Sequence, residues 1–189
     1  MILGSHNSWS YFRCRKWWQR LFSFVGRCQD LDIFQQYEYG VRCFDLRVRF
    51  NSKGELIIAH GLLEYDLHKT DIFATLHALE KKGDVFVRIL HEVRRKKQYT
   101  KENIKRFSDF CSEIEVTFPE ITFWCGRNLY NWEVDYSFDY TPTCDEQYSS
   151  VIKPIWDDWY PKLFAKKNNQ SIKARGTDAD ILLLDFVEL

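Results

Sequence analysis

The chain has 189 residues, and its 27 basic and 27 acidic side chains give a formal net charge of zero. Hydrophobic residues make up 45% and aromatic residues 17% of the chain, which excludes a disordered protein, and the balanced charge gives no sign of a nucleic-acid binder. This length predicts one domain, spanning residues 1–189, with a substantial core. The six cysteines contain no Cys-x-x-Cys pair, so the spacing indicates neither a zinc site nor a disulfide framework.

No apolar run reaches membrane-spanning length, and Met1–Leu3 leaves no room for a signal peptide before the first motif. We therefore expect a monomer that is either cytoplasmic or secreted, in the second case after processing or without a leader. The dispersed cysteines favour a reducing compartment.

Strand-like and helix-like segments alternate along the chain. The first part of the pattern predicts a strand at 1–3, a helical region at 10–38 broken near Gly26, and a strand and hairpin at 40–59. A helix at 70–82, a strand at 84–93, a helix capped by Thr100 and a strand at 121–125 follow. The last part predicts a loop at 126–143, a helical region at 145–167 interrupted by Pro154 and Pro161, a polar connection at 166–178 and a strand at 180–188.

This alternation predicts an α/β protein with a parallel sheet. We count four or five barrel-type strands besides the return strand of the hairpin. A full TIM barrel has eight and typically takes about 250 residues. The expected fold is therefore an abbreviated or irregular TIM (β/α) barrel.

The strand that begins at Gly40 has an unusual face. Val41 and Cys43 are followed on this face by Asp45 and Arg47, so the face is apolar at its start and ionic at its end. Barrel strands show this gradient when the interior is packed at the bottom and the active site lies at the carboxyl ends. The strand therefore predicts an active site beyond Asp45.

Two histidines complete a chemically coherent set with this strand. His6 follows the first strand, and His60 ends the return strand of the hairpin. Cleavage of a phosphodiester by an internal hydroxyl needs one imidazole to remove the hydroxyl proton and a second to protonate the leaving oxygen. A guanidinium such as that of Arg47 stabilises the phosphorane charge. The set of His6, Asp45, Arg47 and His60 thus predicts acid–base catalysis on a phosphodiester.

Four segments together resemble a known family. They are Gly4-Ser-His-Asn-Ser-Trp9, Gly40-Val-Arg-Cys-Phe-Asp-Leu-Arg47, His60-Gly61 and Leu184-Asp-Phe-Val187. In order and strand-end context they resemble the X domain of phosphatidylinositol-specific phospholipase C in its bacterial, metal-independent form, within the phospholipase C-like phosphodiesterase superfamily. The resemblance runs from the first residues to the last and is absent from the middle of the chain. It implies the barrel of that superfamily.

The resemblance also implies a role for each of five residues. His6 matches the general base that deprotonates the inositol 2-hydroxyl, and Asp185 matches the carboxylate that orients it. His60 matches the general acid for the diacylglycerol oxygen. Arg47 matches the arginine that replaces calcium in the bacterial enzymes, and Asp45 matches a carboxylate beside that arginine. The implied reaction is a lyase step that forms a 1,2-cyclic inositol phosphate.

Asn7 departs from the bacterial pattern, which has Asp at this place, and it is similar to a calcium ligand of the eukaryotic enzymes. Asn7, Asp45 and Glu92 offer an alternative, oxygen-rich Ca²⁺ site. Arg47 stands where a divalent cation needs an acid, so we predict no cofactor and no metal.

Three further residues join Asn7 as candidates for substrate binding. Arg88 and Glu92 share the inward face of the strand at 84–93, where an internal ion pair is the alternative. Arg127 follows a strand end and is a candidate for a polar headgroup.

Trp17 and Trp18 lie in a basic amphipathic segment next to the His6 loop, together with Arg13, Arg15, Lys16 and Arg20. One interpretation is a helix packed on the barrel. The other is a rim that contacts an anionic membrane, since tryptophan prefers the interface and arginine the headgroups. A phospholipid headgroup and a peripheral membrane surface are the corresponding predicted partners.

Three functions stay open at this stage. The first is a phosphatidylinositol phospholipase C-like phosphodiesterase. The second is a phosphodiesterase acting on another glycerophospholipid or glycerophosphodiester. The third is a catalytically weakened, headgroup-binding relative. The presence of His6, Arg47 and His60 together favours an enzyme, whereas Asn7 and the short chain support the third.

Overall fold

The computed structural model describes residues 1–93, 100–125, 142–148 and 160–189. Its strands are β1 (Ile2–Ser5), β2 (Cys43–Phe50), β3 (Leu56–His60), β4 (Leu63–Glu64), β5 (Phe86–His91), β6 (Thr122–Cys125), β7 (Cys144–Gln147) and β8 (Ile181–Leu184). Its helices are α1 (Trp17–Leu21), the 3₁₀ turn η1 (Ser23–Val25), α2 (Ile33–Glu38), α3 (Lys69–Glu80), α4 (Lys101–Thr117) and α6 (Pro161–Arg175).

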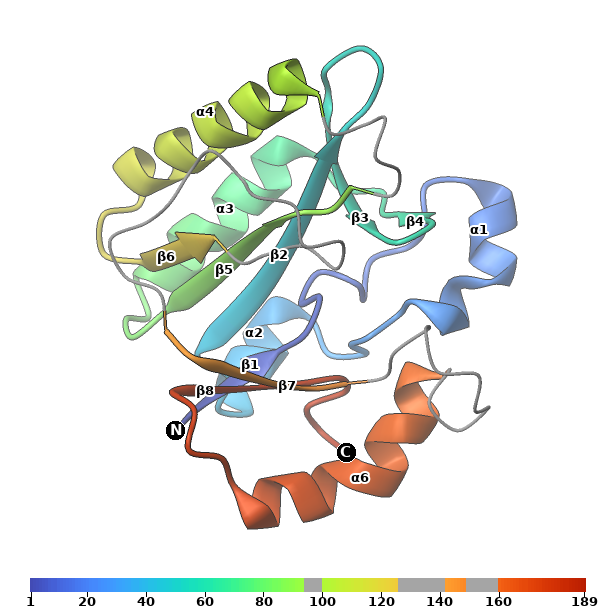
Figure 1. Cartoon of the computed structure of the whole chain (residues 1–189), viewed down its shortest axis with the longest axis vertical. Helices are drawn as coiled ribbons and strands as arrows, with labels where there is room; N and C mark the ends of the chain where they lie inside the picture. The colour runs from blue at the N-terminus through green and yellow to red at the C-terminus, as the bar shows by residue number, and fades with distance from the viewer. Residues whose placement is uncertain (94–99, 126–141, 149–159) are drawn as a thin grey trace.

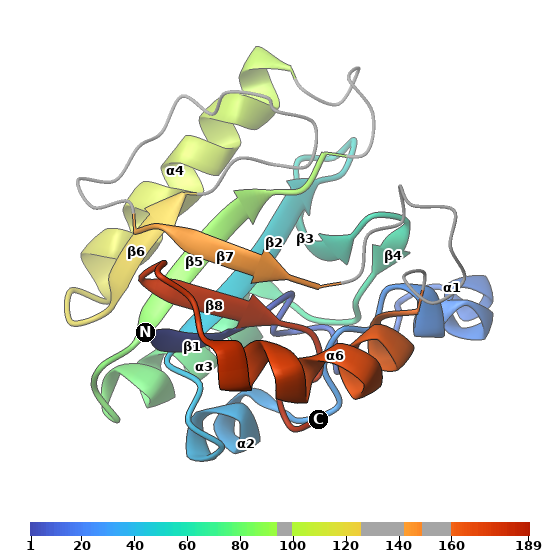
Figure 2. The same cartoon turned by 60° about the horizontal axis from the view of Figure 1, so that its bottom comes forward.

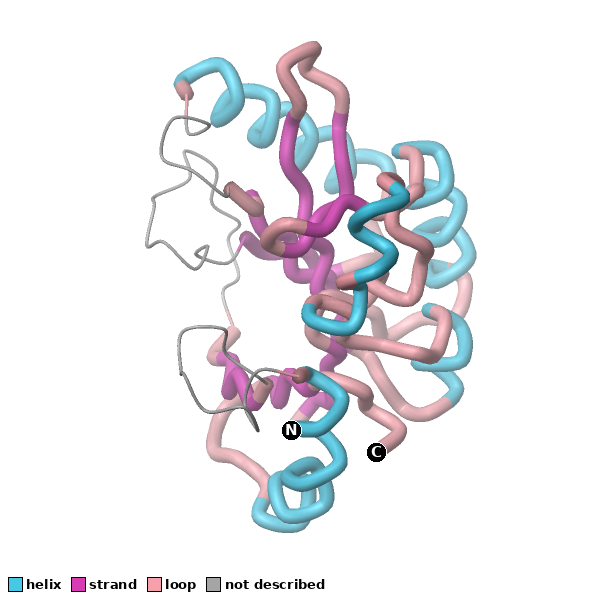
Figure 3. The backbone as a smooth tube through the Cα atoms, turned by 90° about the vertical axis from the view of Figure 1, so that its right-hand side faces the viewer, coloured by secondary structure: helices cyan, strands magenta, loops and turns pink. Residues whose placement is uncertain are grey.

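Six of these strands run parallel in the order β6-β5-β2-β1-β8-β7, and the hairpin strands β3 and β4 extend the sheet antiparallel beside the end of β2. The sheet is curled, with helices α3 and α4 along the outside of β2, β5 and β6 and helix α6 beside β8 (Figures 1 and 2). In Figure 3 most helices lie on one side of the strands. This curled α/β sheet confirms the predicted abbreviated barrel.

Strand β2 is the centre of the sheet, and all eight of its residues are buried. One edge pairs with β5 over six residues. The other edge pairs with β1 only at Cys43 and Phe44, and with β3 only from Val48 onward. On this edge, residues 45–47 of β2 therefore have no strand partner. The loop that follows β1 lies at this gap, where the Ser8 amide donates to the Asp45 carbonyl (3.0 Å).

The close approach of β1 to its neighbours depends on Gly4. A Cβ atom at this position would lie 2.6 Å from a methyl carbon of Leu183 and 3.2 Å from Cβ of Cys43. Any larger residue would push β1 away from β8 or β2, and both strands carry site residues at their ends.

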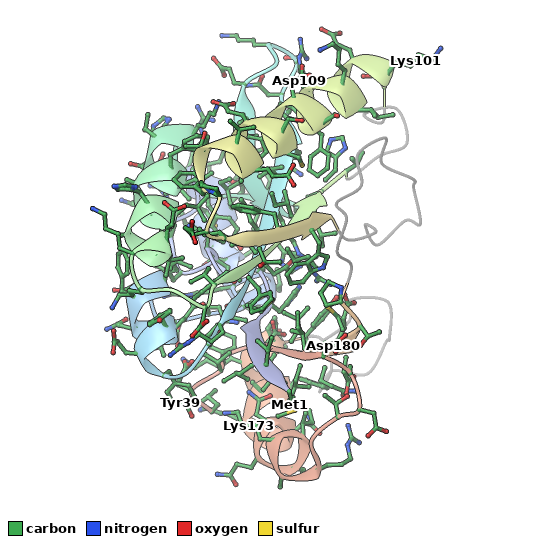
Figure 4. The ribbon with its side chains drawn as sticks, turned by 90° about the vertical axis from the view of Figure 1, so that its left-hand side faces the viewer. Met1, Tyr39, Lys101, Asp109, Lys173 and Asp180 are labelled. Carbon is green, nitrogen blue, oxygen red and sulfur yellow. The ribbon has the colours of Figure 1, made fainter. Side chains whose placement is uncertain are left out.

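Helix α4 begins where the sequence predicts. The Thr100 hydroxyl accepts a hydrogen bond from the Asn103 amide (3.2 Å), as an N-cap should. The buried stripe contains Ile104, Phe107 and Ile114, whereas Lys101 and Asp109 project from the outer face in Figure 4. The region at 10–38 forms short helices with a break that includes Gly26, as predicted. No helix in the described part of the chain is long and apolar enough to cross a membrane.

Two predictions for the last third of the chain are wrong. The helical region expected from residue 145 begins instead with strand β7, which pairs in parallel with β8. The polar connection expected at 166–178 lies largely within helix α6. Pro161 does not interrupt this helix because it stands in the first turn, where no amide donor is needed. Ala165, Asn169 and Ile172 form its buried stripe.

Candidate active site

The ends of β1 and β8 bring a histidine and a carboxylate together. These strands are parallel neighbours, and His6 and Asp185 each follow the last residue of one of them. The His6 Nδ1 atom lies 2.6 Å from Asp185 Oδ1, and both residues are buried. When Nδ1–H donates to this carboxylate, Nε2 keeps the lone pair. Nε2 is buried and has no hydrogen-bond partner among the described residues.

Both turns behind this pair have strained backbones. Asn7 and Phe186 have φ angles of 45° and 44°, in the left-handed region that residues with a Cβ rarely adopt. Buried Gln29 connects the turns, because its Nε2 donates to the carbonyls of His6 (3.0 Å) and Leu184 (2.9 Å). The two strand ends are thus held in a fixed relative position.

His60, at the end of β3, faces His6. The ring centroids are 5.2 Å apart and the planes meet at 85°. His60 Nδ1 lies 3.0 Å from the Gly26 carbonyl oxygen, which makes Nδ1 the donor and leaves Nε2 to gain or lose the exchangeable proton. His60 is partly buried, whereas His6 is buried.

Asp45 lies between two buried arginines on β2 and β5. Its Oδ2 accepts from Arg47 Nε at 2.8 Å, and its Oδ1 accepts from Arg88 Nε at 2.9 Å. Glu92 Oε2 lies 3.5 Å from Arg47 Nη1, and Arg88 also pairs with Glu146. The two guanidinium groups are therefore fixed by four carboxylate contacts. We call Asp45, Arg47, Arg88, Glu92 and Glu146 the arginine clamp.

Known structures share this architecture. The phosphatidylinositol-specific phospholipase C of Listeria monocytogenes aligns over 98% of this chain and 87% of its own, with a TM-score of 0.65 at 15% identity. Two mutants of the Staphylococcus aureus enzyme align over 98% of this chain and 84% of theirs, with TM-scores of 0.64 and 0.62 at 15% and 14% identity. The chain has the fold of bacterial phosphatidylinositol-specific phospholipases C. No protein-family model and no curated protein sequence matches it.

Within this phospholipase C fold, the two histidines are poor proton acceptors at rest. Burial lowers the pKa of His6 well below its ordinary value, and the positive charge of Arg47 adds to the effect. The pKa of His60 is lowered by the same two causes, while Glu92 and the Gly26 carbonyl oppose the change. Both rings are therefore mostly neutral at pH 7.

The arginine clamp behaves in the opposite way. Burial alone would raise the pKa of Asp45, but Arg47 and Arg88 outweigh it and hold that pKa well below its usual range. Burial disfavours the charged form of Arg47, and Asp45 and Glu92 more than offset that, so the pKa of Arg47 is raised. Asp45, Arg47 and Arg88 therefore stay charged at neutral pH.

The structure brings together eight of the residues singled out from the sequence. They are His6, Asn7, Asp45, Arg47, His60, Arg88, Glu92 and Asp185. Arg88 and Glu92 form internal ion pairs, yet with Asp45 and Arg47 and not with each other. Arg127 lies outside the described residues. Trp17 and Trp18, 70% and 41% exposed, lie on helix α1 at the surface.

Asn7 contributes mainly through its backbone. Its amide donates to Asp45 Oδ2 (3.0 Å), and its Nδ2 lies 3.4 Å from the Tyr65 hydroxyl. Its Oδ1 is buried and has no hydrogen-bond partner among the described residues. The alternative Ca²⁺ site does not fit these contacts, because Asp45 and Glu92 already hold the Arg47 guanidinium where the cation would need free oxygens.

Sequence reasoning missed two residues on and after β7. Tyr148 stacks on His6 with a centroid distance of 3.7 Å and an interplanar angle of 6°. Its hydroxyl donates to Glu146 at 2.6 Å, and burial raises its pKa to about 12. Glu146 and Tyr148 have the same strand parity at a carboxyl end, and this pattern would have placed them at the site. The expected helix concealed it.

Proposed function

We propose that this protein is a phosphodiesterase of the phosphatidylinositol phospholipase C type. The observation that carries the proposal is the His6 ring: its buried Nε2 has no partner among the described residues, Asp185 holds its Nδ1, and the His60 ring lies 5.2 Å away between centroids. A buried imidazole held in one tautomer by a carboxylate is arranged to accept a proton. Fold similarity alone would not specify this chemistry.

In the proposed reaction, His6 Nε2 removes the proton of a hydroxyl neighbouring the phosphodiester. The oxygen attacks phosphorus, the bond to the leaving oxygen breaks, and His60, in the minority of molecules in which it is protonated, supplies the proton that this oxygen takes up. The product is a cyclic phosphate, formed as in a lyase reaction, and water can later open it by the reverse roles of the two histidines. Each proton transfer contributes about 10²- to 10⁴-fold in rate.

Arg47 and Arg88 are the proposed anion-binding groups. Both are buried, and Arg88 Nη2 has no hydrogen-bond partner among the described residues. Fixed guanidinium groups stabilise the charge that develops on a five-coordinate phosphorus. Since the Asp45 and Glu92 carboxylates already contact Arg47, we propose that the reaction needs no metal ion and no other cofactor.

The substrate class follows from the surface beside the site. Helix α1 and the turn after it expose four large apolar side chains, which are Trp17 (70% exposed), Leu21 (63%), Phe22 (55%) and Phe24 (49%). Basic residues accompany them in the same segment. Such a surface suits an anionic membrane. One of the aligned S. aureus structures concerns modulation of that enzyme's membrane binding. We propose that a monomer docks through this surface and cleaves a phospholipid headgroup.

The test is an assay on phosphatidylinositol micelles in the presence of a chelator. We expect the release of a cyclic inositol phosphate by the wild type and a release at least about 10²-fold slower by His6→Ala or His60→Ala. A smaller loss in either variant would contradict the acid–base pair, and an activity abolished by the chelator would contradict metal independence.

The headgroup needs a separate test, because the clamp recognises the phosphate and not the alcohol. A panel of glycerophospholipids and soluble glycerophosphodiesters separates the alternatives. Cleavage of phosphatidylinositol alone supports the proposed substrate, whereas preference for another ester with a neighbouring hydroxyl supports the broader phosphodiesterase. A protein that binds inositol phosphate but cleaves nothing is the weakened relative.

A further inference from the structure

Cys28 lies at the histidine pair, although the proposed reaction makes no use of its thiol. One potential ligand atom from each of His6, Cys28 and His60 lies within 4.8 Å of the other two. Cys28 Sγ is 3.8 Å from His60 Nδ1 and 3.4 Å from the Gly26 carbonyl oxygen. These three residues form the one group of three or more potential metal ligands among the described residues.

The position of this thiol is set by its backbone. The Cys28 amide donates to the Ser10 hydroxyl at 2.9 Å, and its carbonyl oxygen accepts from the Phe186 amide at 2.6 Å. Cys28 and His6 are both buried, and His60 is partly buried. The Cys28 backbone is therefore held by Ser10 on one side and by the turn that follows β8 on the other, with its sulfur near both imidazoles.

We propose that His6, Cys28 and His60 bind a thiophilic divalent cation of the Zn²⁺ class and thereby switch the site off. Thiolate and imidazole are the ligands that Zn²⁺ prefers, whereas Ca²⁺ and Mg²⁺ need oxygen. Zn–N bonds of about 2.0 Å and Zn–S bonds of about 2.3 Å place tetrahedral ligand atoms roughly 3.5 Å apart. The three atoms, within 4.8 Å of one another, need to approach by about 1 Å, and His60, the partly exposed member, is the ligand that we expect to move.

Two observations support a ligand at this point. His6 Nε2 is a buried nitrogen without a hydrogen-bond partner among the described residues. Asp185 holds the opposite nitrogen, Nδ1, at 2.6 Å, which is the carboxylate–histidine arrangement that orients metal-binding imidazoles. The Cys28 thiolate and Asp185 supply two negative charges against the cation. The thiol proton leaves to solvent on binding.

Inhibition follows from the same atoms, and this part rests on the proposed function. A cation on His6 Nε2 occupies the lone pair that would accept the hydroxyl proton. A cation on His60 takes the ring away from the leaving oxygen. The bound ion therefore competes with the proton transfers and leaves the arginine clamp untouched.

The binding test needs no activity. Zn²⁺ is titrated into the purified full chain in competition with a chromophoric chelator, and Co²⁺ is used as the spectroscopic probe. We expect a thiolate-to-cobalt absorption band in the wild type and no such band in Cys28→Ser. The Zn²⁺ affinity of Cys28→Ser should be at least about tenfold weaker than that of the wild type, since a thiolate ligand is removed. Cys14→Ser is the matched control, because Cys14 is also a buried thiol. This variant should keep both the cobalt band and the wild-type Zn²⁺ affinity.

Equal Zn²⁺ affinity in the wild type and Cys28→Ser, or no thiolate band with Co²⁺, would overturn the proposal. If Cys28→Ser does not fold, NMR of the imidazole nitrogens in the wild type decides: shifts of both His6 and His60 on adding Zn²⁺ support the site, and unshifted rings reject it.

The activity arm separates this proposal from the proposed function. We expect Zn²⁺ to inhibit micelle cleavage by the wild type and Cys14→Ser, and to inhibit Cys28→Ser at concentrations at least about tenfold higher, in line with the lost ligand. Binding without inhibition rejects the switch. No cleavage in chelator by any of these proteins rejects the proposed function, and the binding titration still decides the metal site.

Discussion

The half of the site built by β1 and β8 differs from the half built by β2 and β5 in how it handles charge. In the first, burial and the charge of Arg47 lower the pKa of His6. The Nε2 atom of His6 has no hydrogen-bond partner among the described residues. In the second, Asp45 and two arginines are paired and stay ionised. One half holds imidazoles that are mostly neutral at pH 7 and can take up a proton, and the other keeps a fixed charge.

This difference separates two demands that a phosphodiesterase places on one site. Proton transfer needs groups that can gain and lose a proton, whereas anion binding needs charges that do not titrate. Arg47 links the two halves, since it contacts Asp45 and also depresses both histidine pKa values. Substitutions in the first half should therefore affect rate, and those in the second should affect stability as well.

The largest expected effect is on rate. His6→Ala and His60→Ala should each lower kcat/KM by about 10²- to 10⁴-fold, because each removes one proton transfer. The double variant should lose less than the product of the two, since the groups act as a unit. Steady-state kinetics on micelles check this, with melting temperatures to show that the variants are folded. A fully multiplicative double variant would mean that the two histidines act independently.

The second-largest effect is expected on the free energy of unfolding, from a substitution that breaks the arginine clamp. Asp45→Asn should destabilise the fold by about 3–5 kcal/mol, because it leaves Arg47 and Arg88 buried without their shared carboxylate. The control is Asp109→Asn, since the exposed Asp109–Lys105 pair on α4 is worth about 0.3–0.5 kcal/mol. Urea denaturation measures both. Similar losses in the two variants would show that the buried network adds nothing beyond a surface pair.

Acidification should affect the histidine half before the clamp. A histidine whose folded pKa lies below its unfolded value of about 6.5 costs stability as pH falls, because the unfolded chain binds the extra proton. His6 and His60 behave this way, and burial lowers the pKa of His91 to about 4. The free energy of unfolding should therefore decline from pH 6.5 to 5, with His91 alone contributing on the order of 2 kcal/mol.

Denaturation at several pH values measures this decline, and His91→Gln should flatten it by up to about 1.4 kcal/mol per pH unit. Asp45 has a depressed pKa, so its stabilising contribution is present at neutral pH and is lost only when pH falls through its folded pKa, well below the usual carboxylate range. A stability that is flat down to pH 5 would contradict the buried, neutral state of the histidines.

The smallest effect should lie outside both halves. Trp17→Ala and Trp18→Ala leave the site unchanged, so cleavage of a soluble substrate should stay at the wild-type rate. Binding to anionic vesicles should weaken by about five- to thirtyfold per substitution, which corresponds to 1–2 kcal/mol of lost apolar contact. Vesicle sedimentation measures it, with Leu163→Ala on helix α6 as the control for an exposed apolar residue (45%). Equal losses in the control would place the membrane contact elsewhere.

Local patterns in the sequence determined the strand and helix types in the first two thirds of the chain and much of the site. The gradient from Cys43 to Arg47 identified β2, because strand parity fixes which side chains share a face. The Thr100 cap and the apolar stripe located α4, because both depend on residues within a few positions. His6 and His60 were recognisable at strand ends for the same reason, whereas Asp185 was identified only through the family resemblance of the closing segment.

Only the tertiary structure decided which strand ends meet. His6 and Asp185 are 179 positions apart, and their contact depends on the pairing of β1 with β8, which long crossovers and packing select and which no local pattern encodes. Strand β7, with the polar sequence Cys144–Gln147, exists because its backbone pairs with β8. It carries Glu146 to the arginine clamp, and Tyr148 follows it onto His6. Cys28 reaches the histidine pair in the same way, since cysteine spacing gives no warning of neighbours brought by the fold.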